Sequence, residues 1–398
     1  MMLRTLKPLR GKVMNMQMVA NKFCSSEVIS AQQQANNKQI AYWLFGMSGL
    51  VAGMVTVGGI TRLTKSGLSM TDWKIQGSLP PRTPEEWEKE FDRYKQFPEW
   101  QQRQSMTVEE FKYIYFWEYG HRMMGRALGV AFVLPMGYFA ARKMIPKSLY
   151  PRLFGLLGLG GSQGLIGWWM VRSGLGDDVK GSKKEIRVSP YRLATHLGMA
   201  FTTFTCLLWT GLDLLNPKAN LKSFAEKLPS AAVKYSREMS KFSRRNVFLV
   251  GATVLSGAFV AGNDAGRAFN SFPLMGDTWI PQGILELEPK WRNFFENTAT
   301  VQFDHRYLAM GTYLSLSTMA LQAYNRTVVW NLMPSLTRHA VKATFLVANA
   351  QVALGISTLL LYVPIELAAL HQVRLSNTLR FVLSTILTLY LLGAVWIL

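Results

Sequence analysis

Long uncharged apolar runs alternate with charged segments along most of this chain. Each run is about as long as a helix that spans a hydrocarbon core roughly 30 Å thick. The runs are apolar on all sides, whereas a soluble amphipathic helix would be apolar along one stripe only. Six runs reach spanning length by themselves, at residues 40–61, 153–171, 193–212, 246–263, 307–325 and 343–365.

Two further runs, 127–141 and 381–398, reach spanning length only when they are extended backwards through arginines. With these two included, the pattern predicts an all-α integral membrane protein with eight transmembrane helices. The segment 80–116 between the first two helices is rich in charges and aromatic residues, and it predicts an amphipathic helical cap outside the membrane.

Several short signals recur in the same order in the two parts of the chain. Four helices fall in each part, so we expect two four-helix bundles related as a parallel repeat. The matched pairs are Glu118-Tyr-Gly-His-Arg122 with Gln302-Phe-Asp-His-Arg306, Gln163-Gly-Leu-Ile-Gly167 with Gln351-Val-Ala-Leu-Gly355, and Ala194-Thr-His196 with Ala369-Leu-His371.

The first 39 residues differ from the rest because they carry six basic residues against one acid, Glu27. Such a segment resembles a mitochondrial presequence, and a basic tail is the alternative. We therefore divide the chain into a presequence and matrix N-terminus (1–39), an N-terminal four-helix half (40–212), a basic matrix linker (213–245) and a C-terminal four-helix half (246–398).

The formal net charge is +20, which in a soluble protein would suggest nucleic acid. Here the charge is better explained by topology, and no nucleic-acid partner is expected. The loop 213–245 has eight basic and three acidic residues, whereas the loop 62–118 has nine basic and ten acidic ones. The positive-inside rule then places the N-terminus and the basic loops in the matrix of a multi-pass inner-membrane protein. The acidic loops face the intermembrane space.

Four of the five histidines open apolar segments, and the predicted topology places all four at the intermembrane-space face: His121, His196, His305 and His371. Imidazole is costly in lipid without a partner, and two imidazoles facing each other across a bundle can ligate a haem iron. Zinc is disfavoured, since two histidines per half with no cysteine make a poor tetrahedral site. We favour pairing His121 with His196 and His305 with His371, with pairing across the halves left open.

Three arginines near these histidines are candidates for binding haem propionates as bidentate forks: Arg122, Arg126 and Arg306. The alternative is that these side chains extend to the lipid headgroups.

The motif from Gly59 to Met70, the two histidine–arginine motifs and Leu370-His371-Gln together resemble haem A synthases of the mitochondrial type over residues 40–398. The resemblance implies oxidation of the C8 methyl of haem O to the formyl of haem A, by successive hydroxylation, for cytochrome c oxidase assembly. It also implies a resident haem B in the C-terminal half and the substrate haem in the N-terminal half. The cysteine pair common in the first outer loop of bacterial relatives is absent here.

Glu118 lies three residues before His121 and so shares its helix face. Its counterpart in the second half, Gln302, cannot ionise. With the resemblance, Glu118 becomes a candidate catalytic residue that stabilises charge on the reacting carbon or accepts a proton from water. The alternative is a carboxylate favoured by the helix dipole.

The expected partners are the lipid bilayer, haem O and the enzyme that supplies it, a ferredoxin-type electron-transfer protein, and further copies of the chain. Two other functions are the alternatives, a non-catalytic electron carrier and a transporter. A non-catalytic electron carrier with two haems would want haems near both membrane faces, and a transporter would want ionisable groups near the midplane. The predicted arrangement of the four histidines fits neither.

Overall fold

The computed structural model describes residues 31–176, 185–215, 229–333 and 335–372. In this part of the chain the regular secondary structure is helical, apart from one isolated β-bridge between Met275 and Thr278. This confirms the all-α class. The long helices are α2 (Ala31–Leu63), α4 (Val108–Ala141), α5 (Tyr150–Leu175), α6 (Pro190–Leu215), α8 (Ser230–Gly262), α10 (Thr298–Asn325) and α12 (Ser335–Leu360).

Five of the described helices are long and apolar enough to cross a membrane, namely α2, α4, α6, α8 and the segment Thr337–Leu360 of α12. This agrees with an integral membrane protein. The helices α5 and α10 contain 26 and 28 residues and coincide with two more of the predicted runs. The eighth predicted helix, 381–398, lies outside the described residues.

Several helix boundaries differ from those predicted by hydropathy. Helix α2 begins at Ala31, inside the segment assigned to the N-terminal leader, and α8 begins at Ser230, inside the expected linker. A helix satisfies its own backbone hydrogen bonds, so it can continue into water with polar side chains on its surface. Gln32 and Gln34 are exposed at the start of α2, and Gln32 Nε2 donates to Asn36 Oδ1 at 3.1 Å.

The apolar run 343–365 does not form one continuous helix. Helix α12 ends at Leu360, and Tyr362 and Val363 have left-handed φ values of 61°. Pro364 follows, and the residue before a proline is disfavoured in the α region. The chain becomes helical again at residues 365–372, which places His371 in a new short helix.

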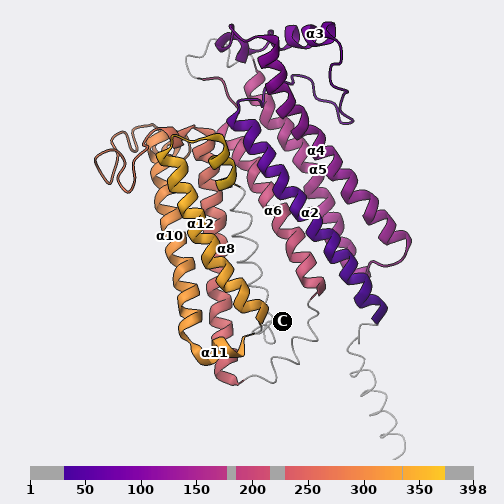
Figure 1. Cartoon of the computed structure of the whole chain (residues 1–398), viewed down its shortest axis with the longest axis vertical. Helices are drawn as coiled ribbons and strands as arrows, with labels where there is room; N and C mark the ends of the chain where they lie inside the picture. The colour runs from indigo at the N-terminus through magenta and orange to yellow at the C-terminus, as the bar shows by residue number, and fades with distance from the viewer. Residues whose placement is uncertain (1–30, 177–184, 216–228, 334, 373–398) are drawn as a thin grey trace, which may run out of the picture.

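The helices form two groups that lie side by side (Figure 1). One contains α2, α4, α5 and α6, and the other contains α8, α10 and α12. Helix α6 packs against α2 and α5 on one side and against α8 on the other. One apolar core continues from Leu44 and Phe204 in the first group to Val250 and Met319 in the second.

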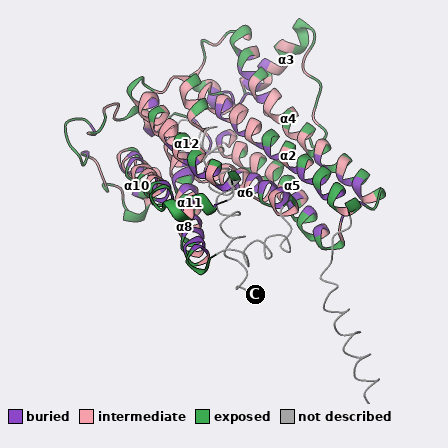
Figure 2. Ribbon diagram, turned by 60° about the horizontal axis from the view of Figure 1, so that its bottom comes forward, coloured by how far each residue is buried: buried purple, intermediate pink, exposed green. Residues whose placement is uncertain are grey.

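Burial along the helices is uneven, and exposed residues recur along each long helix (Figure 2). Many of the exposed residues are large and apolar. Leu134 of α4 and Phe248 of α8 are 68% and 79% exposed. In a chain with these helices, such side chains are suited to contact lipid.

The segment 80–116 folds into the helical cap predicted from its composition. It contains α3 (Pro84–Tyr94), the 3-10 helix η1 (Pro98–Gln102) and the first turns of α4. Both α helices begin with a capping box, at Thr83 and Thr107. Phe91, Tyr94 and Phe111 form a small apolar cluster that fixes the cap to α4.

Candidate functional site

Each of the four histidines rests on a glycine of a neighbouring helix. The glycines lie near the ends of α2, α5, α8 and α12, and the histidines lie in the helical segments that follow, His121 in the first half of α4. A Cβ at any of these glycines would lie 2.9–3.2 Å from Cε1 of the ring, closer than nearly all real contacts. The pairs are Gly58 with His121, Gly167 with His196, Gly257 with His305, and Gly355 with His371.

These contacts bring all four histidines to one end of the bundle, as the sequence predicted. Within that end, His121 and His196 interact electrostatically, and so do His305 and His371. Each interacting pair lies inside one half of the chain. No group of three or more His, Cys, Asp or Glu residues suited to a metal ion occurs among the described residues. Two half-buried imidazoles in each half suit the two axial ligands of a haem iron better than the four ligands of a tetrahedral metal site.

The Nδ1 atoms have partners in the C-terminal half. His305 Nδ1 lies 2.8 Å from Ser256 Oγ, whose own proton is donated to the carbonyl of Thr253. Nδ1–H must then be the donor, which leaves Nε2 with a lone pair for a metal. Gln351 Nε2 donates to the carbonyl of His371 at 2.9 Å and lies 3.1 Å from its Nδ1.

The N-terminal pair lacks such support. The Nδ1 atoms of His121 and His196 are buried without a hydrogen-bond partner. Gln163, the counterpart of Gln351, still donates to the carbonyl of His196 at 3.3 Å. The ring orientations are therefore fixed more firmly in the C-terminal half than in the N-terminal half.

Glu118 is 2% exposed, and both of its oxygens accept hydrogen bonds. Oε2 accepts from Ser69 Oγ at 2.7 Å and from the Met70 amide at 2.8 Å. Oε1 accepts from Arg122 Nη2 at 2.6 Å, one helical turn away. Glu118 thus joins the loop after α2 to the helix that carries His121.

The three candidate arginines all hold loop carbonyls, a role that the sequence did not indicate. They fix the segments that follow α2 and α8, and Gln302 assists by donating to Phe269 O at 3.1 Å. Arg122 donates to Met70 O and Asp72 O, Arg126 to Lys74 O and Ile75 O, and Arg306 to Pro273 O and Leu274 O.

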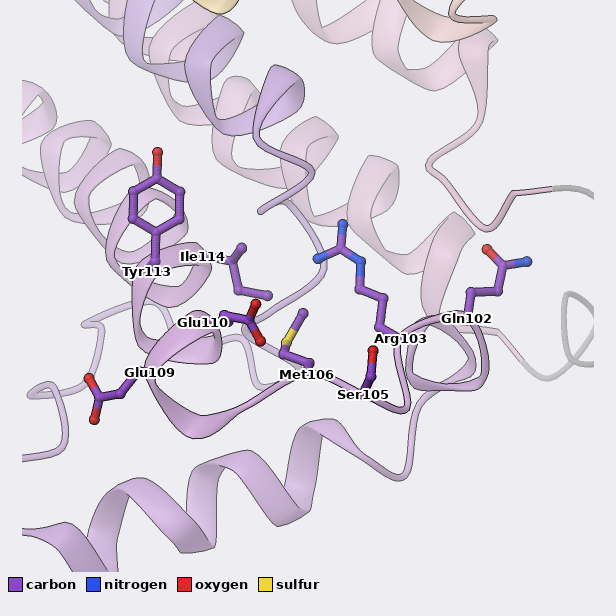
Figure 3. Close-up of a pocket in the computed structure, with 8 residues that line it drawn as sticks. All are labelled: Gln102, Arg103, Ser105, Met106, Glu109, Glu110, Tyr113 and Ile114. Atoms are coloured by element: carbon purple, nitrogen blue, oxygen red, sulfur yellow. The ribbon is translucent and has the colours of Figure 1, made fainter.

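Two hollows lie on the cap side of the first half. A cleft of about 100 Å³ lies between the loop 70–81, α3 and α4, and Arg122 and Arg126 line it. An open hollow of about 580 Å³ lies beside the start of α4 (Figure 3). No histidine lines either one, so neither is the histidine site itself.

A buried carboxyl, Glu99, lies in the cap and was not singled out by the sequence. It is 5% exposed, accepts from Tyr94 Oη at 3.1 Å and pairs with Arg103 at 3.5 Å. Burial raises the pKa of Glu99 to about 7, with Arg103 opposing the rise.

We expect the cap to lose stability as the pH rises from about 4.5 to about 7. The folded state binds the Glu99 proton more tightly than the unfolded state, so stability falls across this window and is constant above it. Amide-exchange protection of residues 84–106, corrected for intrinsic rates, should fall by roughly 300-fold across this window, as linkage to a pKa raised from 4.5 to about 7 requires. Glu99→Gln should flatten the profile, while Glu109→Gln, which is exposed, should not. Equal profiles for wild type and Glu99→Gln would contradict this assignment.

The fold defines a class: a polytopic helical membrane protein with two histidines that rest on glycines in each half. The family model for COX15-CtaA, cytochrome oxidase assembly protein, matches residues 41–383, and the chain belongs to this family.

Curated relatives carry the name haem A synthase. The chain is 49% identical over 341 residues to haem A synthase COX15 of Arabidopsis thaliana, covering 84% of this chain and 71% of that one. It is 44% identical over 347 residues to the Homo sapiens protein of the same name, covering 86% and 81%. A haem A synthase–mitochondrial ferredoxin fusion protein of Schizosaccharomyces pombe is 40% identical over 377 residues, covering 90% and 61%.

Proposed function

We propose that this chain oxidises the C8 methyl of haem O to the formyl of haem A, by successive hydroxylation, for cytochrome c oxidase assembly. Family membership makes the chain a haem A synthase, an oxidoreductase. The observation that carries the proposal is the placement of four half-buried histidines, each on a glycine, at one end of the helices. A non-catalytic electron carrier is not favoured by the family.

We propose two four-helix units arranged as a parallel repeat. Support comes from matching contacts on both sides: each unit has two histidines on glycines, a glutamine on the carbonyl of its second histidine, and an arginine on the carbonyls of the loop before its first histidine. The helix from 381 to 398 would complete the second unit.

We assign haem B to His305 and His371 and the substrate haem O to His121 and His196. The His305 ring, which Ser256 holds at Nδ1, suits a resident cofactor, since an outer hydrogen bond that fixes a ligand strengthens metal binding. The less constrained N-terminal pair suits a haem that must enter and leave.

The haem groups supply the oxidation chemistry when bound, and the protein positions them. His121 and His196 would hold the substrate iron, while Glu118, on the face of His121, would stabilise positive charge on the reacting carbon or accept a proton from water. Arg122, Arg126 and Arg306 hold the loops over the sites, and propionates would compete for the same donors.

The test of the proposed function is the haem content of the purified protein after expression with haem O supply. We expect haem B together with haem O and haem A. Haem B alone under these conditions would favour an electron carrier, and no haem at all would exclude both haem functions.

A ferredoxin-type protein is the proposed electron-transfer partner. Support comes from the Schizosaccharomyces pombe relative, whose name describes a fusion to mitochondrial ferredoxin. The enzyme that supplies haem O and further copies of this chain remain proposed partners.

The mitochondrial relatives and the apolar helices make this chain a mitochondrial membrane protein. We propose the inner membrane, with the N-terminus in the matrix and the histidine end toward the intermembrane space. This orientation follows from the basic loops and the positive-inside rule.

Single cysteines introduced at exposed positions should report this orientation. In mitoplasts of a Cys24→Ser/Cys206→Ser background, an impermeant maleimide should label Glu88→Cys in the cap and should leave Lys147→Cys, at the opposite end, unlabelled. Both should react after detergent. Labelling of Lys147→Cys alone would show that the orientation is the reverse of the one proposed.

A further inference from the structure

Two consecutive glycines near the end of α2 receive side chains from different halves of the chain. His121 of the N-terminal pair rests on Gly58, and the carboxamide of Gln372 lies on Gly59. A Cβ at Gly59 would overlap Gln372 Oε1 and would lie 3.0 Å from its Cδ. Gln372 directly follows His371, so this contact joins the two histidine pairs.

The contact has no polar counterpart in the other half. His196 is followed by Leu197, an apolar residue that packs against the main core. A contact that both halves share is made by the same residue type in each half. Gln163 donates to the carbonyl of His196, and Gln351 donates to the carbonyl of His371. Gln372 therefore belongs to the contact between the two halves and is not a feature shared by both histidine sites.

Other contacts fix the same end of α2 to the second half. Arg62 Nη2 donates to the carbonyl of Ala261 at 3.0 Å and pairs with Asp264 at 3.1 Å. Asp264 also pairs with Arg187 of the first half at 2.8 Å. The last turn of α2 is thus held to the second half through Arg62, and a shift of Gln372 cannot be absorbed by a free helix end.

We propose that Gln372 is a positioning residue that couples the two haem sites through its contact with Gly59. The carboxamide fixes the position of the short helix 365–372, which carries His371, relative to α2, on which His121 rests. Axial-ligand orientation and the groups around the ligands tune a haem's potential. The state of one site therefore changes the properties of the other, and the coupling is reciprocal. This inference rests on the proposed function, because it requires a haem in each half.

The contact itself is tested without haem by a double-mutant cycle on the melting temperature. Gly59→Ala should lower it, because the new methyl displaces the carboxamide, and Gln372→Ala in the same chain should relieve most of the loss. Such non-additivity is the sign of a direct contact. Gly53→Ala is the matched control in α2, because a Cβ there meets nothing within 4 Å. Additive effects of Gly59→Ala and Gln372→Ala would overturn the contact.

The coupling is tested by the midpoint potential and the low-field EPR signal of the C-terminal haem in full-length protein. Each is measured with the N-terminal site loaded and after His121→Ala has emptied it. We expect a difference in wild type and in Gly53→Ala. In Gln372→Leu, which copies the residue after His196, and in Gly59→Ala, more than half of the difference should be lost while haem content stays at the wild-type level.

A difference that survives intact in both variants would overturn the coupling role, and so would the absence of any difference in wild type. Absence of haem from the wild-type protein is a separate result, because it would overturn the proposed function first. A fall in haem A formed per haem O in Gln372→Leu, with both haems bound, would support the inference further.

Discussion

Replacing His305 or His371 with alanine should strip haem B from the protein and destabilise the C-terminal half. Each ring is a proposed axial ligand, and each is held on a glycine with a partner at its Nδ1. A cofactor that binds only the folded state stabilises it by mass action, by about 4 kcal/mol when its concentration is 1,000 times its Kd. We therefore expect a large fall in melting temperature together with loss of the bis-imidazole spectrum.

The matched control is His339→Ala, since His339 is an exposed histidine of α12 whose Nδ1 lies 2.7 Å from the carbonyl of Ser335. It should keep full haem content and an unchanged spectrum. His305→Ala and His371→Ala proteins that retain haem B at wild-type levels would show that the ligands have been assigned wrongly. Loss in the His339→Ala protein would point to an unspecific effect of the substitution.

Much of the fold could be predicted because spanning helices leave a strong signal in hydropathy. The predicted runs that fall among the described residues all lie within or largely within helices. Helix ends were less predictable, because an apolar run marks only the part of a helix that lies in lipid, and a helix can continue beyond the membrane. Leu360 shows the opposite case, where a helix ends inside an apolar run because Pro364 follows.

The site was predictable in its histidines but not in their surroundings. Four histidines at the starts of apolar segments are visible in the sequence. Two of the glycines beneath them, Gly167 and Gly355, could have been found by the recurring Gln-to-Gly spacing of 163–167 and 351–355. The loop contacts of Arg122 could not, because carbonyl acceptors carry no residue signature. Gln372 and Glu99 acquire their roles only through tertiary contacts.

Glu118→Gln should lower haem A formation by two or more orders of magnitude while both haem sites still fill. The substitution keeps the shape of the side chain and removes its negative charge, and losing one preorganised electrostatic group in a catalytic site costs about 100-fold to 1,000-fold in rate. Neither histidine pair is altered, so haem O and haem B should bind as before. The motivation is the contrast with Gln302 at the matching place in the repeat. Haem A formed per bound haem is the measurement.

The structure also gives Glu118 a second role, because it accepts from Ser69, Met70 and Arg122. Ser69→Ala separates the two roles, since it removes one donor and leaves the carboxylate charged. It should cost roughly 1–3 kcal/mol of local stability and leave most of the turnover intact. Gln302→Glu should create no activity in the C-terminal half, because the haem B proposed there would carry no farnesyl group. If Glu118→Gln retains near-normal conversion and only loses stability as Ser69→Ala does, then Glu118 holds the loop after α2 and takes no part in the oxidation.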